Sequence, residues 1–150
     1  MEKIMKDTVF YSISKTEREH ITSVISNVLN GDEDIIFAYL YGSFTTESPF
    51  EDIDIFIYVR NDKEPFVSAM RIKEKVFDAV TAHGFNTFVI DDFDVKVINN
   101  SPYDFAINLL CKGQLIVDKN PELRTNYIEQ MSDEYRVNYF ILDEAYGEDR

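Results

Sequence analysis

Apolar positions along the chain follow two different periods, which predict four helices and five strands. Apolar residues three or four positions apart indicate an amphipathic helix, whereas short apolar runs bounded by Gly, Pro or Asp indicate strands. Ser14 and Glu17 form a capping box, in which each side chain can satisfy a free backbone N–H of the first helical turn. The predicted helices run from Ser14 to Gly31, Pro65 to Gly84, Ser101 to Gly113 and Asn120 to Ala145, and the predicted strands are 35–41, 52–59, 85–90, 93–99 and 114–117.

The order of these elements predicts one α+β domain. It reads α, β, β, α, β, β, α, β, α, and the third and fourth strands are separated only by Asp91 and Asp92, as in a hairpin. Strands in adjacent pairs with helices between them favour a mixed β-sheet with helices packed mainly on one side. One domain is expected over 1–150, with no structure assigned to 1–13 and a tail at 146–150 that should fray.

Apolar stripes on the helices predict their buried faces, and in the third helix Phe105, Leu109 and Leu110 are expected to face inward. In the second helix the stripe consists of Phe66, Ala69, Met70, Phe77 and Val80, interrupted by one lysine. The predicted buried side of the last helix consists of Leu123, Tyr127, Met131, Tyr135 and Phe140.

The composition narrows the class of protein. The chain has 15 Lys and Arg against 28 Asp and Glu, a net charge of −13, and 45% of its residues are apolar. That apolar share excludes a disordered acidic tail, and the acidity argues against a direct grip on nucleic acid. Cys111 is the single cysteine and there are two histidines, which disfavours disulfides and zinc. We expect no membrane span and no signal peptide, and therefore a cytoplasmic protein.

The segment most informative about chemistry is Gly42-Ser43, followed after eight residues by Asp52-Ile53-Asp54. Two carboxylates on one face of a strand repel each other unless a cation lies between them, and Mg²⁺ prefers such oxygen ligands. Gly42 lets the backbone approach a ligand closely, and Ser43 offers an N–H and a hydroxyl to a phosphate. Asp94, flanked by apolar residues on a later strand, is a candidate third carboxylate.

The Asp52 and Asp54 pair could also be a pair of ordinary surface carboxylates. At this acidity, about five acid-x-acid pairs arise by chance, so the spacing by itself is a weak motif. The pattern alone therefore leaves open both a metal site and a charged strand edge. The pairs present are Glu17/Glu19, Asp32/Asp34, Asp52/Asp54, Asp62/Glu64 and Asp92/Asp94.

The combined segments IIFAYLYGS, DIDIFIYV, FDVKVINNSP and LLCKGQLIVDKNPELR resemble the polymerase-β-type nucleotidyltransferase superfamily. Within it, the chain is most similar to the minimal nucleotidyltransferases, including the MntA family of antitoxins. The resemblance implies a nucleotidyltransferase fold and transfer of AMP from ATP to a hydroxyl, with two Mg²⁺ ions. In that family the acceptor is a tyrosine of a HEPN toxin ribonuclease, so the resemblance implies such a toxin as partner.

The resemblance also implies roles for individual residues. Gly42 and Ser43 match the loop that holds the nucleotide phosphates, and Asp52 and Asp54 match the pair that binds the metal ions. Asp94 matches the third carboxylate, which also helps to deprotonate the acceptor. Asp92 competes with it for that role, and we prefer Asp94 because apolar residues flank it.

Three departures from the family pattern keep alternatives open. The spacer of eight residues between Ser43 and Asp52 is shorter than the usual ten, the usual Arg and Gly after Gly-Ser are missing, and Glu51 replaces a Ser. One alternative is an antitoxin that neutralises its partner by contact without catalysis. Another is a transferase for a small molecule such as an antibiotic, disfavoured because 150 residues leave little room for a substrate domain. The sequence leaves open the acceptor hydroxyl, the preferred nucleotide base and the oligomeric state, which includes both a homo-oligomer and a hetero-oligomer.

Overall fold

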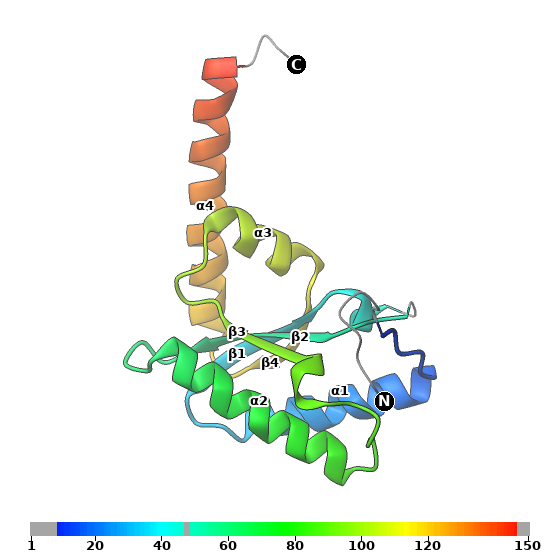
Figure 1. The fold of residues 1–150 in the computed structure, drawn as a ribbon. Coiled ribbons are helices and arrows are strands. Elements are labelled where there is room, and N and C mark those ends of the chain that lie inside the picture. Colours follow the sequence, from blue (N-terminus) through cyan, green and yellow to red (C-terminus); the bar gives the residue numbers. More distant parts are fainter. Residues whose placement is uncertain (1–8, 47–48, 147–150) are drawn as a thin grey trace.

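The computed structural model describes residues 9–46 and 49–146, with side chains up to residue 138. Most of the predicted tail 146–150 and most of 1–13 therefore lie outside it, and Tyr146 ends the last helix. Two short 3₁₀ helices, η1 and η2, accompany four α-helices and four strands in this part of the chain (Figure 1). The elements are α1 (Lys15–Asn30), β1 (Ile35–Tyr41), η1 (Ser43–Thr45), β2 (Ile53–Val59), α2 (Pro65–Ala82), η2 (Ile90–Asp92), β3 (Phe93–Val97), α3 (Tyr103–Lys112), β4 (Gln114–Asp118) and α4 (Pro121–Tyr146).

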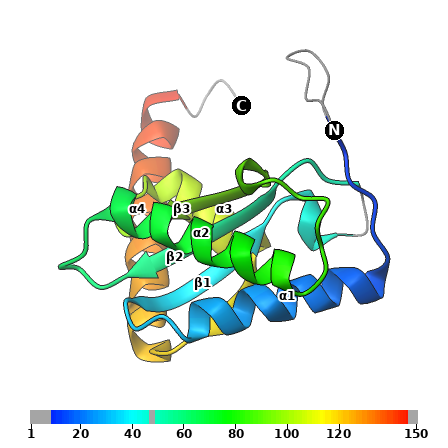
Figure 2. The same cartoon turned by 60° about the horizontal axis from the view of Figure 1, so that its bottom comes forward.

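The four strands form one mixed sheet in the order β3-β2-β1-β4. β1 pairs antiparallel with β2 and β4, whereas β2 and β3 run parallel. The predicted mixed sheet and α+β class are confirmed. Each face of the sheet carries two helices, α1 and α2 on one and α3 and α4 on the other (Figures 1 and 2), so the helices are not mainly on one side as we expected.

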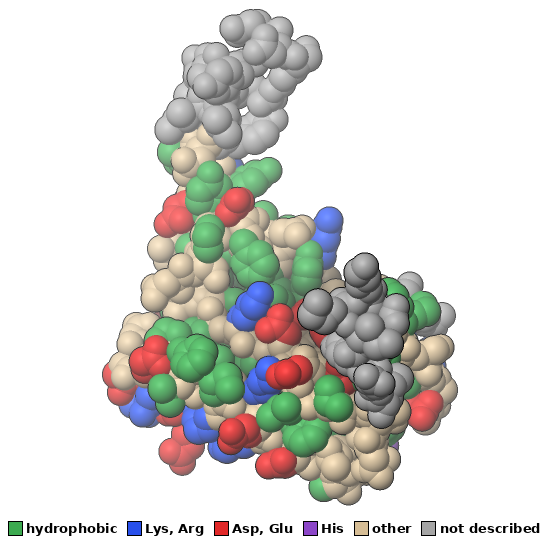
Figure 3. Space-filling view, viewed as in Figure 1, with side chains coloured by type: hydrophobic (Ala, Val, Ile, Leu, Met, Phe, Trp, Pro, Cys, Tyr) green, Lys and Arg blue, Asp and Glu red, His purple; other side chains and the backbone are tan. Residues whose placement is uncertain are grey.

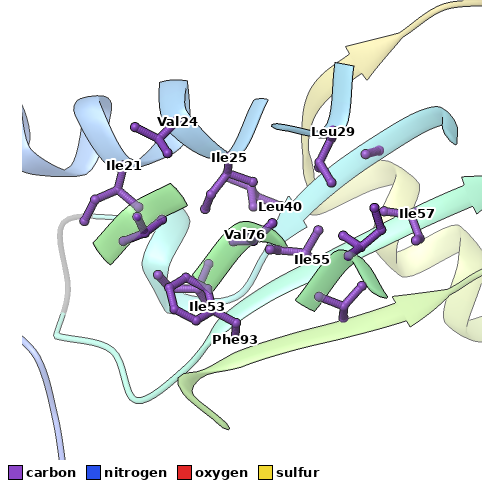
Figure 4. Packing of buried hydrophobic residues seen from close by; sticks show 14 of the residues in the cluster. Ile21, Val24, Ile25, Leu29, Leu40, Ile53, Ile55, Ile57, Val76 and Phe93 are labelled. Atoms are coloured by element: carbon purple, nitrogen blue, oxygen red, sulfur yellow. The ribbon is translucent and has the colours of Figure 1, made fainter. Parts of the chain in front are cut away.

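The larger hydrophobic core lies between the sheet and the α1–α2 layer. Alternate residues of β2, namely Ile53, Ile55 and Ile57, point into it and are fully buried. They meet Ile25 of α1 and Val76 of α2 (Figure 4). Each such side chain contributes about 1.5–3 kcal/mol by leaving water, so this face anchors the strand that carries Asp54.

The second core lies between the other face of the sheet and α3 and α4. Tyr127 and Met131 of α4 are buried there, as predicted, beside Phe56 of β2. Tyr135, predicted to be buried, is 41% exposed. Figure 1 shows that α4 projects away from the sheet and past α3. The side chain of Phe140 lies outside the described part of the chain.

The predicted strand 85–90 is wrong, and with it the predicted hairpin. Residues 85–89 form turns and irregular backbone, and Ile90 begins η2. The carboxylate of Asp92 accepts a hydrogen bond from Val89 N at 2.8 Å, which closes a turn where the hairpin would have needed a ladder. Phe88 still reaches the core from this irregular segment.

The predicted buried stripe of α2 is also shifted around the helix. The buried residues are Ser68, Ile72, Val76 and Val80, at a spacing of four, whereas Phe66 is 70% exposed. Burying the three β-branched side chains against the sheet turns Phe66 outward. Figure 3 shows hydrophobic side chains interspersed with charged ones over the surface seen in Figure 1.

None of the helices that the structure describes combines the length and the hydropathy needed to cross a bilayer.

Candidate functional site

The turn after β1 holds Gly42 in a conformation that favours glycine. Its φ is +91°, and a Cβ at this position would lie 2.8 Å from Asp54 Oδ2. A side chain is therefore disfavoured here both by the backbone and by the neighbouring carboxylate. The Gly42 backbone consequently lies directly against Asp54, which joins the two halves of the motif seen in the sequence.

The 3₁₀ turn η1 after Gly42 is fixed by its own hydroxyls. Thr45 Oγ1 donates to Gly42 O at 2.7 Å, and Thr46 Oγ1 donates to Ser43 O at 2.9 Å. Ser43 itself is exposed at the start of this turn. The carbonyls of Gly42 and Ser43 thus accept hydrogen bonds from within the turn. The exposed side of the turn is formed by Gly42 and Ser43.

A buried arginine on α1 supports the same turn from behind. Arg18 Nη1 donates to Phe44 O, and the guanidinium lies over the rings of Phe44 and Phe50, 5.3 and 5.5 Å from their centroids. The charge is therefore held by a carbonyl and two aromatic faces. Arg18 is not predictable from the sequence, because nothing in the local pattern distinguishes it from a solvated helical arginine.

Pairing of β2 with β3 places Asp54 and Asp94 side by side. They are direct partners in the parallel register, and both belong to the face of the sheet that carries α3 and α4. Lys96, two residues along β3, places Nζ 3.7 Å from Asp94 Oδ2. Two carboxylates that lie far apart in the sequence thus meet at one end of the sheet.

The surroundings of Asp54 disfavour the negative charge of its carboxylate. Burial and the charges of Asp94 and Asp52 raise the pKa of Asp54 from 3.8 to about 6, against a smaller opposite effect of Lys96. Asp52, just before β2, is thus close enough for its charge to act on Asp54. A raised carboxyl pKa in a cluster of like charges is typical of sites that bind a cation or move a proton.

Asp92, the competitor for the third carboxylate, serves the structure. Its side chain is 2% exposed, and it accepts hydrogen bonds from Tyr11 Oη and Val89 N. Burial and this bond to Asp92 raise the pKa of the Tyr11 hydroxyl. Asp94 is more accessible, with a side chain that is 44% exposed, so of the two carboxylates it is the one that a ligand can reach.

The donor chemistry of this end suits Mg²⁺. Among the residues described, no three acidic, histidine or cysteine side chains already form a ready-made set of ligands. Mg²⁺ does not require one, because it is usually held by one or two carboxylates with water and substrate phosphates completing its shell. Asp54 and Asp94 could supply that pair, and the charge repulsion that adds to burial in raising the Asp54 pKa is what a cation would relieve.

Known proteins share the sequence pattern of most of this chain. Residues 23–122 match the model of the family described as Polymerase beta, Nucleotidyltransferase. A comparison with curated proteins finds no match.

Several solved structures share the fold. A chain of the tri-AMPylated Shewanella oneidensis HEPN toxin in complex with MNT antitoxin matches with a TM-score of 0.56 and 13% identity, covering 91% of this chain and 98% of that one. A toxin–antitoxin structure with AMP-PNP matches with a TM-score of 0.60 and 15% identity, covering 85% and 96%. A mutant of the toxin–antitoxin MntA-HpeT matches with a TM-score of 0.58 and 13% identity, covering 88% and 96%.

Proposed function

This chain belongs to the polymerase beta nucleotidyltransferase family, and from that premise we propose that it is an Mg²⁺-dependent adenylyltransferase acting as an antitoxin. It transfers AMP from ATP to a tyrosine hydroxyl of a partner HEPN toxin. One observation carries the proposal: Asp54 and Asp94 lie side by side, and Asp54 lies directly against the Gly42 turn. The fold neighbours support it, because one contains an AMPylated HEPN toxin with its antitoxin and another contains AMP-PNP.

In this proposal each residue acts on a defined part of the nucleotide. The Gly42 and Ser43 turn binds the terminal phosphates, which it can approach because no side chain intervenes at Gly42. Asp52, Asp54 and Asp94 would hold two Mg²⁺ ions, which neutralise phosphate charge when bound. Binding and orientation by these groups supply most of the rate enhancement.

The reaction is an exchange at the α-phosphorus. The tyrosine oxygen forms a bond to this phosphorus, the bond from the phosphorus to the bridging oxygen breaks, and pyrophosphate leaves. Asp94, accessible at the sheet edge, accepts the hydroxyl proton.

The test is transfer of label from [α-³²P]ATP to the toxin encoded beside this chain, in the presence of Mg²⁺. We expect labelled toxin with the wild type and none with Asp52→Asn/Asp54→Asn. A matched control, Glu74→Gln/Asp78→Asn, removes two charges from an exposed part of α2 and should retain labelling. Label that persists in the Asp52/Asp54 variant would refute catalysis by these carboxylates.

The same variant distinguishes catalysis from neutralisation by contact. If the toxin stays inhibited by the Asp52→Asn/Asp54→Asn variant without acquiring label, the chain is a binding antitoxin and the proposed chemistry is wrong.

A further inference from the structure

An aromatic surface begins immediately beside the carboxylates. Tyr41, the last residue of β1, is the antiparallel partner of Asp54, which in turn is the parallel partner of Asp94. Neighbouring side chains on one face of a sheet lie about 5 Å apart. The three side chains therefore form one row across the sheet, in which an aromatic ring follows two carboxylates.

Tyr41 is part of a closed set of contacts that reaches from the sheet to α3. The Tyr41 ring lies 6.1 Å from that of Phe56, which lies 5.3 Å from Phe105 of α3. Asn108, one turn further along α3, donates from Nδ2 to Tyr41 Oη at 2.7 Å. We call Tyr41, Phe56 and Phe105 the aromatic ledge.

Two of the three rings of the ledge are not fully used in core packing, because they remain partly exposed to solvent. Phe56 is 5% exposed and serves as its base, whereas Phe105 is 38% exposed and Tyr41 is partly exposed. α3 lies over the same face of the sheet as the carboxylate row (Figure 1). The ledge is thus a flat apolar surface next to the carboxylates of Asp54 and Asp94. A ligand that contacts both would combine an aromatic group with a group that a cation can link to the carboxylates.

We propose that the aromatic ledge binds the nucleobase of the nucleotide whose phosphates lie at Gly42 and Asp54. This inference rests on the proposed function for the presence of a nucleotide. A base is a flat aromatic group joined to phosphates through one ribose, which matches a ledge that starts one strand away from Asp54. Stacking on Phe105 and Tyr41 supplies affinity, and the Asn108 amide is placed to hydrogen bond the base edge.

Phe66 provides the matched control. It is also an exposed phenylalanine on a helix, at 70% exposure, but it belongs to α2 on the opposite face of the sheet from Asp54. Phe105→Leu removes the planar ring while keeping an apolar side chain against Phe56. Phe66→Leu makes the same chemical change away from the site, and Phe105→Tyr retains the ring.

The experiment measures binding of Mg²⁺·ATP and of Mg²⁺·tripolyphosphate by calorimetry. We expect Phe105→Leu to weaken ATP binding about tenfold, since stacking on one ring commonly contributes that factor. Tripolyphosphate, which has no base, should bind unchanged. Phe66→Leu and Phe105→Tyr should bind both probes like the wild type, and thermal unfolding followed by circular dichroism checks that each variant is folded.

The outcomes separate this inference from the proposed function. Equal loss of both probes in Phe105→Leu, or no loss of either, overturns the ledge as a base site. Binding of tripolyphosphate but no tighter binding of ATP in the wild type overturns it as well, while the phosphate site stands. Binding of neither probe overturns both proposals. ATP binding that depends on Phe105, without label transfer to any toxin, overturns the adenylyltransferase and supports the ledge.

Discussion

Replacing Asp54 with Asn should stabilise the metal-free protein at neutral pH. The folded state raises the pKa of this carboxyl to about 6 from an ordinary 3.8, because burial and two neighbouring carboxylates disfavour its charge. The folded protein therefore binds this proton more tightly than the unfolded chain does. The resulting penalty is absent below pH 3.8, grows between pH 3.8 and 6, and is complete above pH 6.

The size of the effect follows from the two pKa values. Their separation corresponds to about 3 kcal/mol, at about 1.4 kcal/mol for each tenfold change in proton affinity. Because the side chain is partly exposed, solvent screening reduces this ceiling, and we expect a gain of about 1–2 kcal/mol for Asp54→Asn at pH 7.5. Near pH 4 the variant and the wild type should be equally stable.

Urea unfolding in EDTA, followed by circular dichroism at both pH values, measures this difference. Asp78→Asn, on an exposed position of α2, is the control and should change stability at neither pH. The reasoning from burial and like charges would be contradicted if Asp54→Asn were no more stable than the wild type at pH 7.5. It would also be contradicted if the variant were more stable by the same amount at both pH values. Replacing EDTA with Mg²⁺ should stabilise the wild type and Asp78→Asn but not Asp54→Asn, because only the first two keep all the carboxylates that would bind the ion.

Four further substitutions test separate parts of the structure. Gly42→Ala should cost about 1–3 kcal/mol in thermal unfolding, because it combines a φ of +91° with a Cβ only 2.8 Å from Asp54 Oδ2; unchanged stability would refute the close approach. Burial raises the pKa of Asp32, but hydrogen bonds from its cationic partners outweigh this and hold it below the ordinary value, so its contribution is present above pH 3.8 and is lost as the pH falls further. Asp32→Asn should therefore lose about 1–3 kcal/mol of unfolding free energy at pH 7, and its stability should fall less than that of the wild type as the pH is lowered below 3.8. A constant difference between the two proteins at all pH values would contradict this reasoning. Asp92→Asn should lose about 1–2 kcal/mol in urea unfolding yet still label the toxin, whereas Asp94→Asn should fold and not label; the reverse assignment of activity would make Asp92 the functional carboxylate.

Local signals in the sequence predicted the parts of the fold that local forces determine. The Ser14–Glu17 capping box is formed as predicted, and its helix ends at Asn30, just before Gly31. The hairpin failed because a side chain competes with the backbone: Asp92 bonds Val89 N, so apolar residues that favour a strand form a turn instead. The period of apolar residues alone does not reveal that competition.

The site was accessible to sequence reasoning only in part. The Gly42 turn and Asp54 are close in sequence and their pattern singled out both, and the structure places the Gly42 backbone against Asp54. The register of Asp94 with Asp54, and the contact of Tyr41 with Asn108, depend on which strands and helices become neighbours. Those are long-range choices made by burial of the whole sheet, and no local pattern encodes them. The ligands that these residues bind stay a prediction.

The parallel pairing of β2 and β3 has a consequence for how the protein folds. Parallel strands cannot be joined by a tight turn, so the chain must cross over through α2 before Asp54 meets Asp94. Closing that long connection is slow compared with forming a helix or a hairpin. The carboxylate pair is therefore complete only when β2, α2 and β3 have come together, and an ion that needs both side chains binds that assembled state.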